Sequence, residues 1–126
     1  MKKKVGRKND NKKIPLNLIS NYALEELAEV LSFGARKYDP WNWAYGMSYS
    51  RVIAAVKRHI AQWENREEKD FDNKCKECKN NTCLNHSNRH HLGAAMCGLM
   101  FLLDYEARNM KHLDDRRPLE TLRRKK

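Results

Sequence analysis

Apolar side chains recur at helical spacing near the start of the chain. They follow the i, i+3, i+4, i+7 pattern that gives a helix one apolar face. Ser20 before this pattern and Gly34 after it are typical N-cap and stop residues. The pattern therefore predicts a helix over residues 21–33. Its apolar members are Leu24, Leu27, Ala28 and Leu31.

A second segment with the same period predicts a helix over residues 49–65, which Ser48 or Ser50 can cap. His59 lies within its apolar stripe. A histidine at such a position is either packed and hydrogen-bonded or, beside Arg58, part of a phosphate clamp with a proton-transfer group. The stripe consists of Val52, Ala55, Val56, Ile60 and Trp63.

The most apolar segment predicts a third helix, which opens at Ser87 or Asn88 and runs to about Asn109. The small residues of this helix permit close approach of another helix, and they are Gly93, Ala94, Ala95 and Gly98. Cys97 within the same helix is expected to be a buried hydrophobe. From Asp114 onward we expect irregular chain, apart from a possible short helix after Pro118.

No segment alternates strictly between apolar and polar residues, so we expect no strand. The expected fold class is all-α: a small helical bundle with a Cys-rich, zinc-knuckle-like loop. So few long helices bury a small core, which favours completion of that core by a homo-oligomer, a dimer or a tetramer.

The first two helices are joined by an aromatic connector, FGARKYDPWNWAYG, over residues 33–46. Asp39-Pro40 marks a turn and Gly46 ends it. Phe33 and Trp43 are expected to pack this turn, whereas Tyr38 or Trp41 can form a surface on which a flat molecule stacks, with Asn42 beside it. The alternative is that all five aromatic side chains pack, some of them across a subunit interface.

The formal charge of +10 is concentrated at the two ends of the chain. Residues 1–13 and 116–126 form basic tails that carry +11 together. Residues 14–115, the expected domain, therefore carry a net charge of −1. Such tails are expected to be solvated and disordered, or extended in the case of residues 1–13, and the alternative is weak, non-specific contact with nucleic acid. No apolar run suits a membrane span or a secretion signal, which predicts a cytoplasmic protein without membrane contact.

A Cys-rich insertion occupies residues 74–91. Two close pairs of thiolate or imidazole ligands in a loop almost without apolar residues suit tetrahedral Zn²⁺. A filled set of four protein ligands marks a structural zinc site, and the alternative is free thiols. His90 or His91, in the first turn of the third helix, can replace the histidine of this set. The expected ligands are Cys75, Cys78, Cys83 and His86.

The first predicted helix carries three carboxylates, Glu25, Glu26 and Glu29. Glu26 and Glu29 are three residues apart, which places them on one helix face. Helical geometry turns this face away from Leu24 and Leu31, so it is either a solvated acidic face or a site for a hard cation such as Mg²⁺.

Several motifs follow one another between residues 13 and 65. They are KIPLNLI, ALEELAEVLSFGARKYDPWNW, Gly46, Ser50-Arg51 and Arg58-His59, with HHLGAAMCGLMFLLDYE later in the chain. Together they resemble a phage-associated family described as dATP/dGTP diphosphohydrolases. The EELAE motif is also similar to the first metal-binding element of the MazG-like all-α nucleotide pyrophosphohydrolases, with Glu26 and Glu29 as its ExxE pair.

The resemblance implies a hydrolase of nucleotide metabolism in the host cytoplasm, which converts a (deoxy)purine nucleoside triphosphate such as dATP or dGTP to monophosphate and pyrophosphate. Glu26 and Glu29, with Glu25, would hold Mg²⁺ (or Mn²⁺), which lowers the pKa of a bound water. His59 would accept a proton or orient that water. The substrate-binding residues would be Lys37, Tyr38, Trp41, Asn42, Arg51 and Arg58.

The sequence departs from the MazG-like pattern in one respect. Those enzymes carry a second pair, ExxD, on the next helix, whereas residues 49–65 offer no acid before Glu64. This departure keeps a non-catalytic nucleotide-binding or sequestering protein as the alternative. A zinc-stabilised nucleic-acid-binding protein is disfavoured, because the expected domain is not basic. The second half-site, meaning the ligands that would take the place of the ExxD pair at the metal, has as candidates Glu67, Asp70, Asp72, His59, His91 and Asp104.

Overall fold

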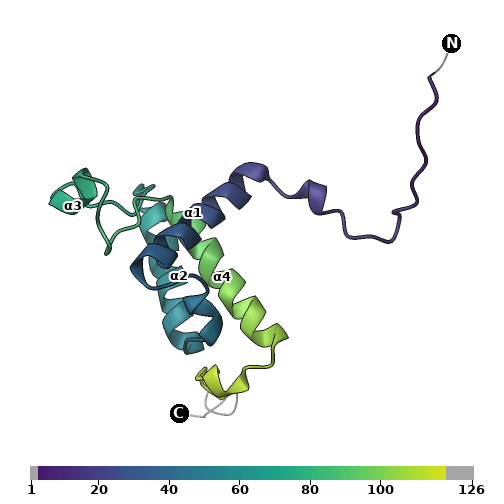
Figure 1. Ribbon diagram of the computed structural model, residues 1–126. Helices are drawn as coiled ribbons and strands as arrows, with labels where there is room; N and C mark the ends of the chain where they lie inside the picture. The colour runs from purple at the N-terminus through teal and green to yellow at the C-terminus, as the bar shows by residue number, and fades with distance from the viewer. Residues whose placement is uncertain (1–2, 119–126) are drawn as a thin grey trace.

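The computed structural model describes residues 3–118, and its regular elements are helical, which confirms the all-α prediction (Figure 1). Within this range the one trace of sheet is an isolated antiparallel bridge between Lys69 and His90. Residues 114–118 are irregular, as expected, and the helix predicted after Pro118 falls on residues outside the described range. The elements are η1 (Leu16–Leu18), α1 (Asn21–Lys37), η2 (Asn42–Tyr45), α2 (Tyr49–Glu64), α3 (Lys76–Lys79), α4 (His91–Ala107) and η3 (Lys111–Leu113).

Helix α1 begins where it was predicted and ends four residues later than predicted. Ser20 caps it, because its Oγ accepts a hydrogen bond from Ala23 N at 3.1 Å. The expected stop at Gly34 is wrong: the helix continues through this glycine to Lys37. A glycine inside a helix costs only about 1 kcal/mol. The stronger signal is Asp39-Pro40, since a residue that precedes proline is disfavoured in helical conformation.

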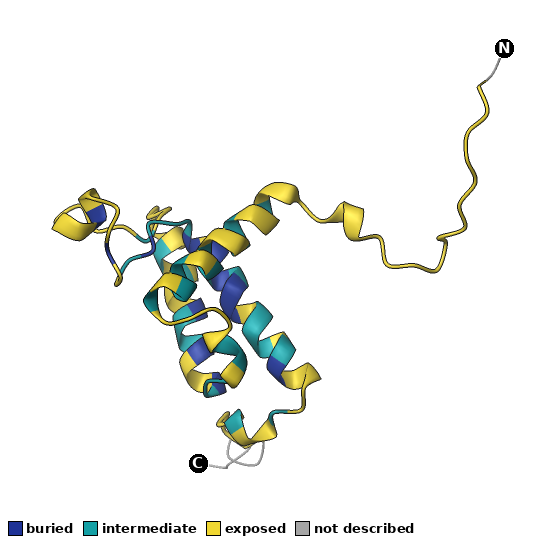
Figure 2. Cartoon of the chain, viewed as in Figure 1, coloured by how far each residue is buried: buried dark blue, intermediate teal, exposed yellow. Residues whose placement is uncertain are grey.

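The core lies between α2 and α4, which pack side by side (Figure 2). Val52 and Val56 of α2 are buried against Gly98 of α4. A Cβ on Gly98 would lie 2.5 Å from Val56 Cγ2, so the small-residue face does permit the close approach that was predicted. Cys97 is also buried, as expected.

Both α2 and α4 begin differently from the prediction. Ser48 occupies the N-cap position of α2 without a side-chain bond, and Ser50 bonds to Asp115 instead of capping the helix. Helix α4 begins at His91, three or four residues later than predicted. Residues 88–91 donate backbone hydrogen bonds to, or accept them from, residues 68–70, and this pairing holds residues 88–90 outside the helix. His90 caps α4 through its ring Nδ1, which accepts from Leu92 N at 3.0 Å.

Aromatic side chains close the end of the core opposite His91. Tyr105 is fully buried and donates its hydroxyl hydrogen bond to the Trp43 carbonyl oxygen. Trp43 stacks on Phe101 with ring centroids 4.9 Å apart, so it packs as predicted. Trp41 differs, because its backbone is left-handed (φ 66°) and its side chain is 70% exposed.

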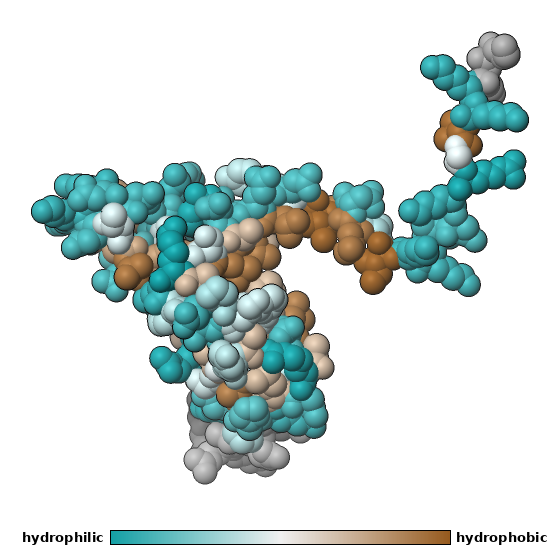
Figure 3. Space-filling view, viewed as in Figure 1, coloured by the Kyte–Doolittle hydropathy of each residue, from teal (hydrophilic) through white to brown (hydrophobic). Residues whose placement is uncertain are grey.

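The N-terminal part of the described chain lies apart from this core. Residues 3–20 extend away from the helices, and an apolar surface runs along η1 and the start of α1 (Figure 3). Leu24, expected on the buried face of α1, is 52% exposed. No helix among residues 3–118 is long and apolar enough to cross a bilayer. The exposed apolar residues of this surface are Ile14, Leu16, Leu18, Ile19, Tyr22 and Leu24.

Candidate functional site

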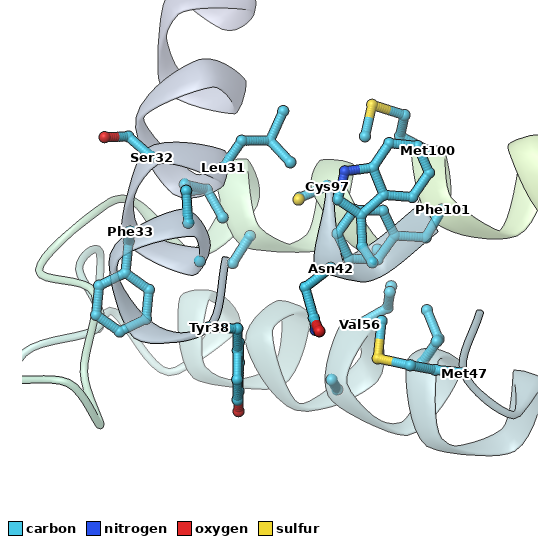
Figure 4. A pocket seen from close by; sticks show the side chains of 18 of the residues that line it. Leu31, Ser32, Phe33, Tyr38, Asn42, Met47, Val56, Cys97, Met100 and Phe101 are labelled. Carbon is cyan, nitrogen blue, oxygen red and sulfur yellow. The ribbon is translucent and has the colours of Figure 1, made fainter. Parts of the chain in front are cut away.

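A cleft of about 740 Å³ opens between α1, η2, α2 and α4 (Figure 4). Its walls are mostly apolar. Phe33 and Tyr38 lie on the α1 side, Met100 and Phe101 lie on the opposite side, and Asn42 projects between them. A cleft of this size with apolar walls and a few polar groups is typical of a site for a small organic molecule.

Most of the residues that the sequence singled out for substrate binding line this cleft. Lys37 is the exception, and its Nζ lies 5.4 Å from the centre of the Tyr38 ring. Phe33, expected to pack the connector, is half-buried and also lines the cleft. The lining includes Tyr38, Trp41, Asn42, Arg51, Arg58 and His59.

His59 is paired with a second histidine at the inner end of the cleft. Its Nδ1 lies 2.8 Å from Nδ1 of His91, a side chain that is only 1% exposed. One of these nitrogens donates and the other accepts, so at least one ring is neutral. Burial lowers the pKa of His59, and the positive charge of Arg58 acts in the same direction, whereas Asp70 opposes both.

The carboxylates of α1 are not part of the cleft lining, and Glu26 and Glu29 face the segment that precedes α4. Glu26, whose side chain is 12% exposed, accepts from Arg89 Nη2 at 2.9 Å and from His90 N at 3.1 Å. Glu29 is 56% exposed and lies 3.9 Å from Arg89 Nη1. Glu26 is therefore not part of a solvated face, whereas Glu25 is exposed.

The electrostatics of Glu26 follow from these contacts. Burial raises the pKa of its carboxyl, but the His90 backbone N–H and the Arg89 guanidinium outweigh burial and hold that pKa below its ordinary value. Gly93 permits this arrangement, since a Cβ there would lie 3.0 Å from Glu26 Cγ. The close approach of α1 and α4 thus depends on a second glycine of the small-residue face.

The Cys-rich segment brings its four expected ligands together. The ligand atoms of Cys75, Cys78, Cys83 and His86 all lie within 4.8 Å of one another. Cys75 Sγ is 3.9 Å from Cys83 Sγ, and His86 Nδ1 is 3.4 Å from Cys78 Sγ and 3.5 Å from Cys83 Sγ. Tetrahedral Zn²⁺ with these ligands has edges of about 3.5–3.8 Å, so the group could hold such a metal.

The cysteines of this group differ in acidity, and burial raises the pKa of the Cys78 thiol to about 11. Burial raises the pKa of the Cys83 thiol, but hydrogen bonds from the backbone N–H groups of Asn85 and His86 and contact with the His86 ring outweigh it and lower that pKa to about 7. Thiolate is the form that binds metal. His90 and His91, the other candidates for the fourth ligand, point elsewhere: His90 caps α4 and His91 contacts His59.

Asp70 joins the Cys-rich segment to the start of α4. Its Oδ2 accepts from Ser87 N at 3.0 Å, and its backbone pairs with Asn88 and Arg89. A second cavity of about 380 Å³ lies here, and most of the candidate residues for the second half-site line it. Asp104 is not among them, because it lies at the opposite end of α4 and pairs with Arg108 at 2.6 Å. The lining includes Glu67, Asp70, Asp72, His86 and His91.

Arg89 is the residue of this site that sequence reasoning missed. It lies in the irregular segment before α4, where no motif or periodicity distinguishes it from the other basic residues of the loop. Its contact with Glu26 spans 63 positions of the chain, so only the fold brings the two together.

Comparison with known proteins agrees with the motifs. A family model described as dATP/dGTP diphosphohydrolase, N-terminal, matches residues 3–116. A dATP/dGTP diphosphohydrolase of Salmonella phage PMBT28 is 35% identical over 112 residues, which are 89% of this chain and 33% of that protein. The chain therefore spans about one third of the length of this relative. No solved structure matches this chain significantly. The chain belongs to the dATP/dGTP diphosphohydrolase N-terminal family.

Proposed function

We propose that this chain hydrolyses a (deoxy)purine nucleoside triphosphate, such as dATP or dGTP, to monophosphate and pyrophosphate with the help of a divalent cation. The observation that carries the proposal is the contact of Glu26 with Gly93, which precedes Ala94 in the wall of an apolar cleft. The lining of this cleft includes Arg51, Arg58 and His59. The name of the phage relative agrees with this substrate class.

The carboxylate pair suits a hard cation. One guanidinium reaches both carboxylates, which places their oxygens around a single cationic centre. Mg²⁺ or Mn²⁺ held there would neutralise phosphate charge and lower the pKa of a bound water. Glu26 and Glu29 hold the cation in this proposal. Glu25 is exposed and would contact the cation at most through a water molecule.

The other polar residues bind and orient the nucleotide. Arg51 and Arg58 lie on α2 and neutralise the negative charge that develops on the leaving pyrophosphate, with Lys37 assisting from the end of α1. Tyr38, Trp41 and Asn42 contact the base in the cleft.

His59 is the proton acceptor in this proposal. Its lowered pKa keeps the ring neutral at pH 7, and a neutral ring can accept a proton. The contact with buried His91 fixes the orientation of the ring. Attack by water on the α-phosphorus would release one proton to this ring while the bond to pyrophosphate breaks.

Two further elements complete the proposal. Zn²⁺ on the Cys75, Cys78, Cys83 and His86 group is structural, since four protein ligands leave no position for substrate. The exposed apolar surface of η1 and α1 is the contact through which the chain forms a homodimer or tetramer.

The direct test measures products from a panel of ribo- and deoxyribonucleoside triphosphates with Mg²⁺. Glu26→Gln or Glu29→Gln is expected to reduce turnover at least about a hundredfold, because each removes a charged ligand of the cation. Glu106→Gln, an exposed carboxylate at the far end of α4, is the matched control. Unchanged turnover in both site variants would refute the assignment of the pair.

Sequestration without catalysis is the second candidate, and one observation favours it. Glu26 is already neutralised by Arg89, and α2 carries no acid before Glu64. Tight binding of dATP or dGTP without monophosphate and pyrophosphate as products would replace hydrolysis by sequestration.

A further inference from the structure

Arg89 lies where a cation between Glu26 and Glu29 would be expected. Its Nη2 is 2.9 Å from Glu26 Oε2, and its Nη1 is 3.9 Å from Glu29 Oε2. Two positive charges in contact with one carboxylate pair repel each other strongly in a partly buried site. A divalent cation and the Arg89 guanidinium therefore cannot both occupy this place.

The two oxygens of Glu26 have different partners. Oε1 accepts from His90 N at the start of α4, and Oε2 accepts from Arg89. The first bond belongs to the backbone of a helix end and stays in place when side chains move. Departure of Arg89 would thus free Oε2 for another cation, while Oε1 would still hold the carboxylate in position.

The backbone of Arg89 is anchored by two hydrogen bonds, whereas its side chain leaves one donor unused. Arg89 N donates to Ser87 Oγ at 3.2 Å, and its carbonyl oxygen accepts from Asp70 N at 2.9 Å. The side chain is 36% exposed, and its Nε is buried without a hydrogen-bond partner among residues 3–118. A guanidinium with an unused donor is not optimally bound where it lies.

We propose that Arg89 is an internal cation that holds the Glu26–Glu29 pair until a divalent cation replaces it, and that it then binds the phosphates of the nucleotide. The proposal rests on the function proposed above and adds a phosphate-binding residue to it. A displaced guanidinium needs anionic acceptors, and a triphosphate brought by the divalent cation supplies them beside the same carboxylates. Arginine suits this exchange, since its planar fork binds carboxylate and phosphate alike.

The test measures Mn²⁺ binding to zinc-loaded, nucleotide-free protein by electron paramagnetic resonance. Arg89→Met removes the competing charge and is expected to tighten Mn²⁺ binding by about tenfold, the equivalent of one charge-assisted hydrogen bond. The same variant is expected to bind a non-hydrolysable dGTP analogue with Mn²⁺ more weakly. Arg108→Met, which breaks an arginine–carboxylate pair at the other end of α4, should change neither affinity.

Each outcome decides one of the proposals. If Arg89→Met is folded and binds Mn²⁺ no more tightly than wild type, Arg89 is a permanent structural partner of Glu26 and the exchange is refuted. If neither protein binds Mn²⁺ and neither turns over nucleotide, the proposed function fails with it. Should Arg89→Met not fold, the wild-type Arg89 Nε–Hε NMR signal gives the answer: it must shift on saturation with Mg²⁺, and an unmoved signal refutes the exchange.

Discussion

The two candidate metal sites of this chain are organised in opposite ways. The Cys-rich group lies in a loop with few apolar residues, and its four ligands converge although little else holds the loop. The carboxylate pair lies on a long regular helix, and a guanidinium of the same chain already neutralises it. Under the functions proposed above, a loop of thiolate and imidazole ligands would need its metal in order to fold. Carboxylates that would bind a hard cation can instead be held in place by an arginine of the same chain.

Removing a ligand from the Cys-rich group is expected to have the largest effect on the fold. Cys78→Ser takes a buried ligand from the group and should abolish stoichiometric zinc binding. Without metal, residues 72–90 lose their order, because the segment buries few apolar side chains. Metal analysis and hydrogen exchange of this segment measure the effect.

Cys97→Ala is the matched control for this prediction. Cys97 is buried on α4 outside the group, and burial raises the pKa of its thiol to about 12, so it stays an unreactive thiol. The variant should keep full zinc content. Two results would contradict the claim that residues 72–90 depend on zinc for their order. One is purified wild-type protein without zinc, and the other is a Cys78→Ser variant in which this segment stays ordered.

The carboxylate site should respond to mutation moderately and in a pH-dependent way. Glu26→Gln removes the charge that pairs with Arg89 and is expected to lower the free energy of unfolding by about 1–3 kcal/mol at pH 6. The folded-state pKa of Glu26 lies below its ordinary value of 4.5, so the stabilisation is present above that value and is lost as pH falls through the folded-state pKa. The difference between wild type and variant should therefore shrink between pH 6 and pH 3.

Urea unfolding of both proteins in Mg²⁺-free buffer measures this difference. Any zinc lost at low pH would be lost from wild type and variant alike, so its effect on stability cancels when the two are compared. A gap in stability that stays constant from pH 6 to pH 3 would mean that the charge of Glu26 contributes nothing to the fold.

The parts of this molecule that sequence could predict are the local ones. Helical periodicity located α1, α2 and α4, and ligand spacing located the four residues of the Cys-rich group. Helix α1 continues past Gly34 because a glycine inside a helix is a weaker stop signal than Asp39-Pro40. The start of α4 was missed because a backbone pairing with residues 68–70 competes with the helix, and nothing in residues 87–91 alone reveals that partner.

The candidate site was predictable only in part, for the same reason. Periodicity placed Glu26 opposite Leu24, but the expectation that Leu24 would be buried assumed a partner for that face of α1. In the fold α1 turns Glu26 toward α4 instead, where Gly93 leaves room for it. Arg89 and the contact between His59 and His91 depend on segments that are distant in sequence, which no local pattern encodes.

Glu29 gives the smallest expected effect on stability. Its carboxylate is 56% exposed and 3.9 Å from Arg89, and an exposed pair of this kind contributes at most about 0.5 kcal/mol. Glu29→Gln should therefore unfold at the same urea concentration as wild type, while its affinity for Mn²⁺ falls. Glu26→Gln should lose both stability and Mn²⁺ affinity, so the two variants separate the carboxylate that serves fold and cation from the one that serves the cation alone. If Glu29→Gln were as unstable as Glu26→Gln, both carboxylates would serve a structural ion-pair network with Arg89. The proposal that the pair is available to bind a divalent cation would then be wrong.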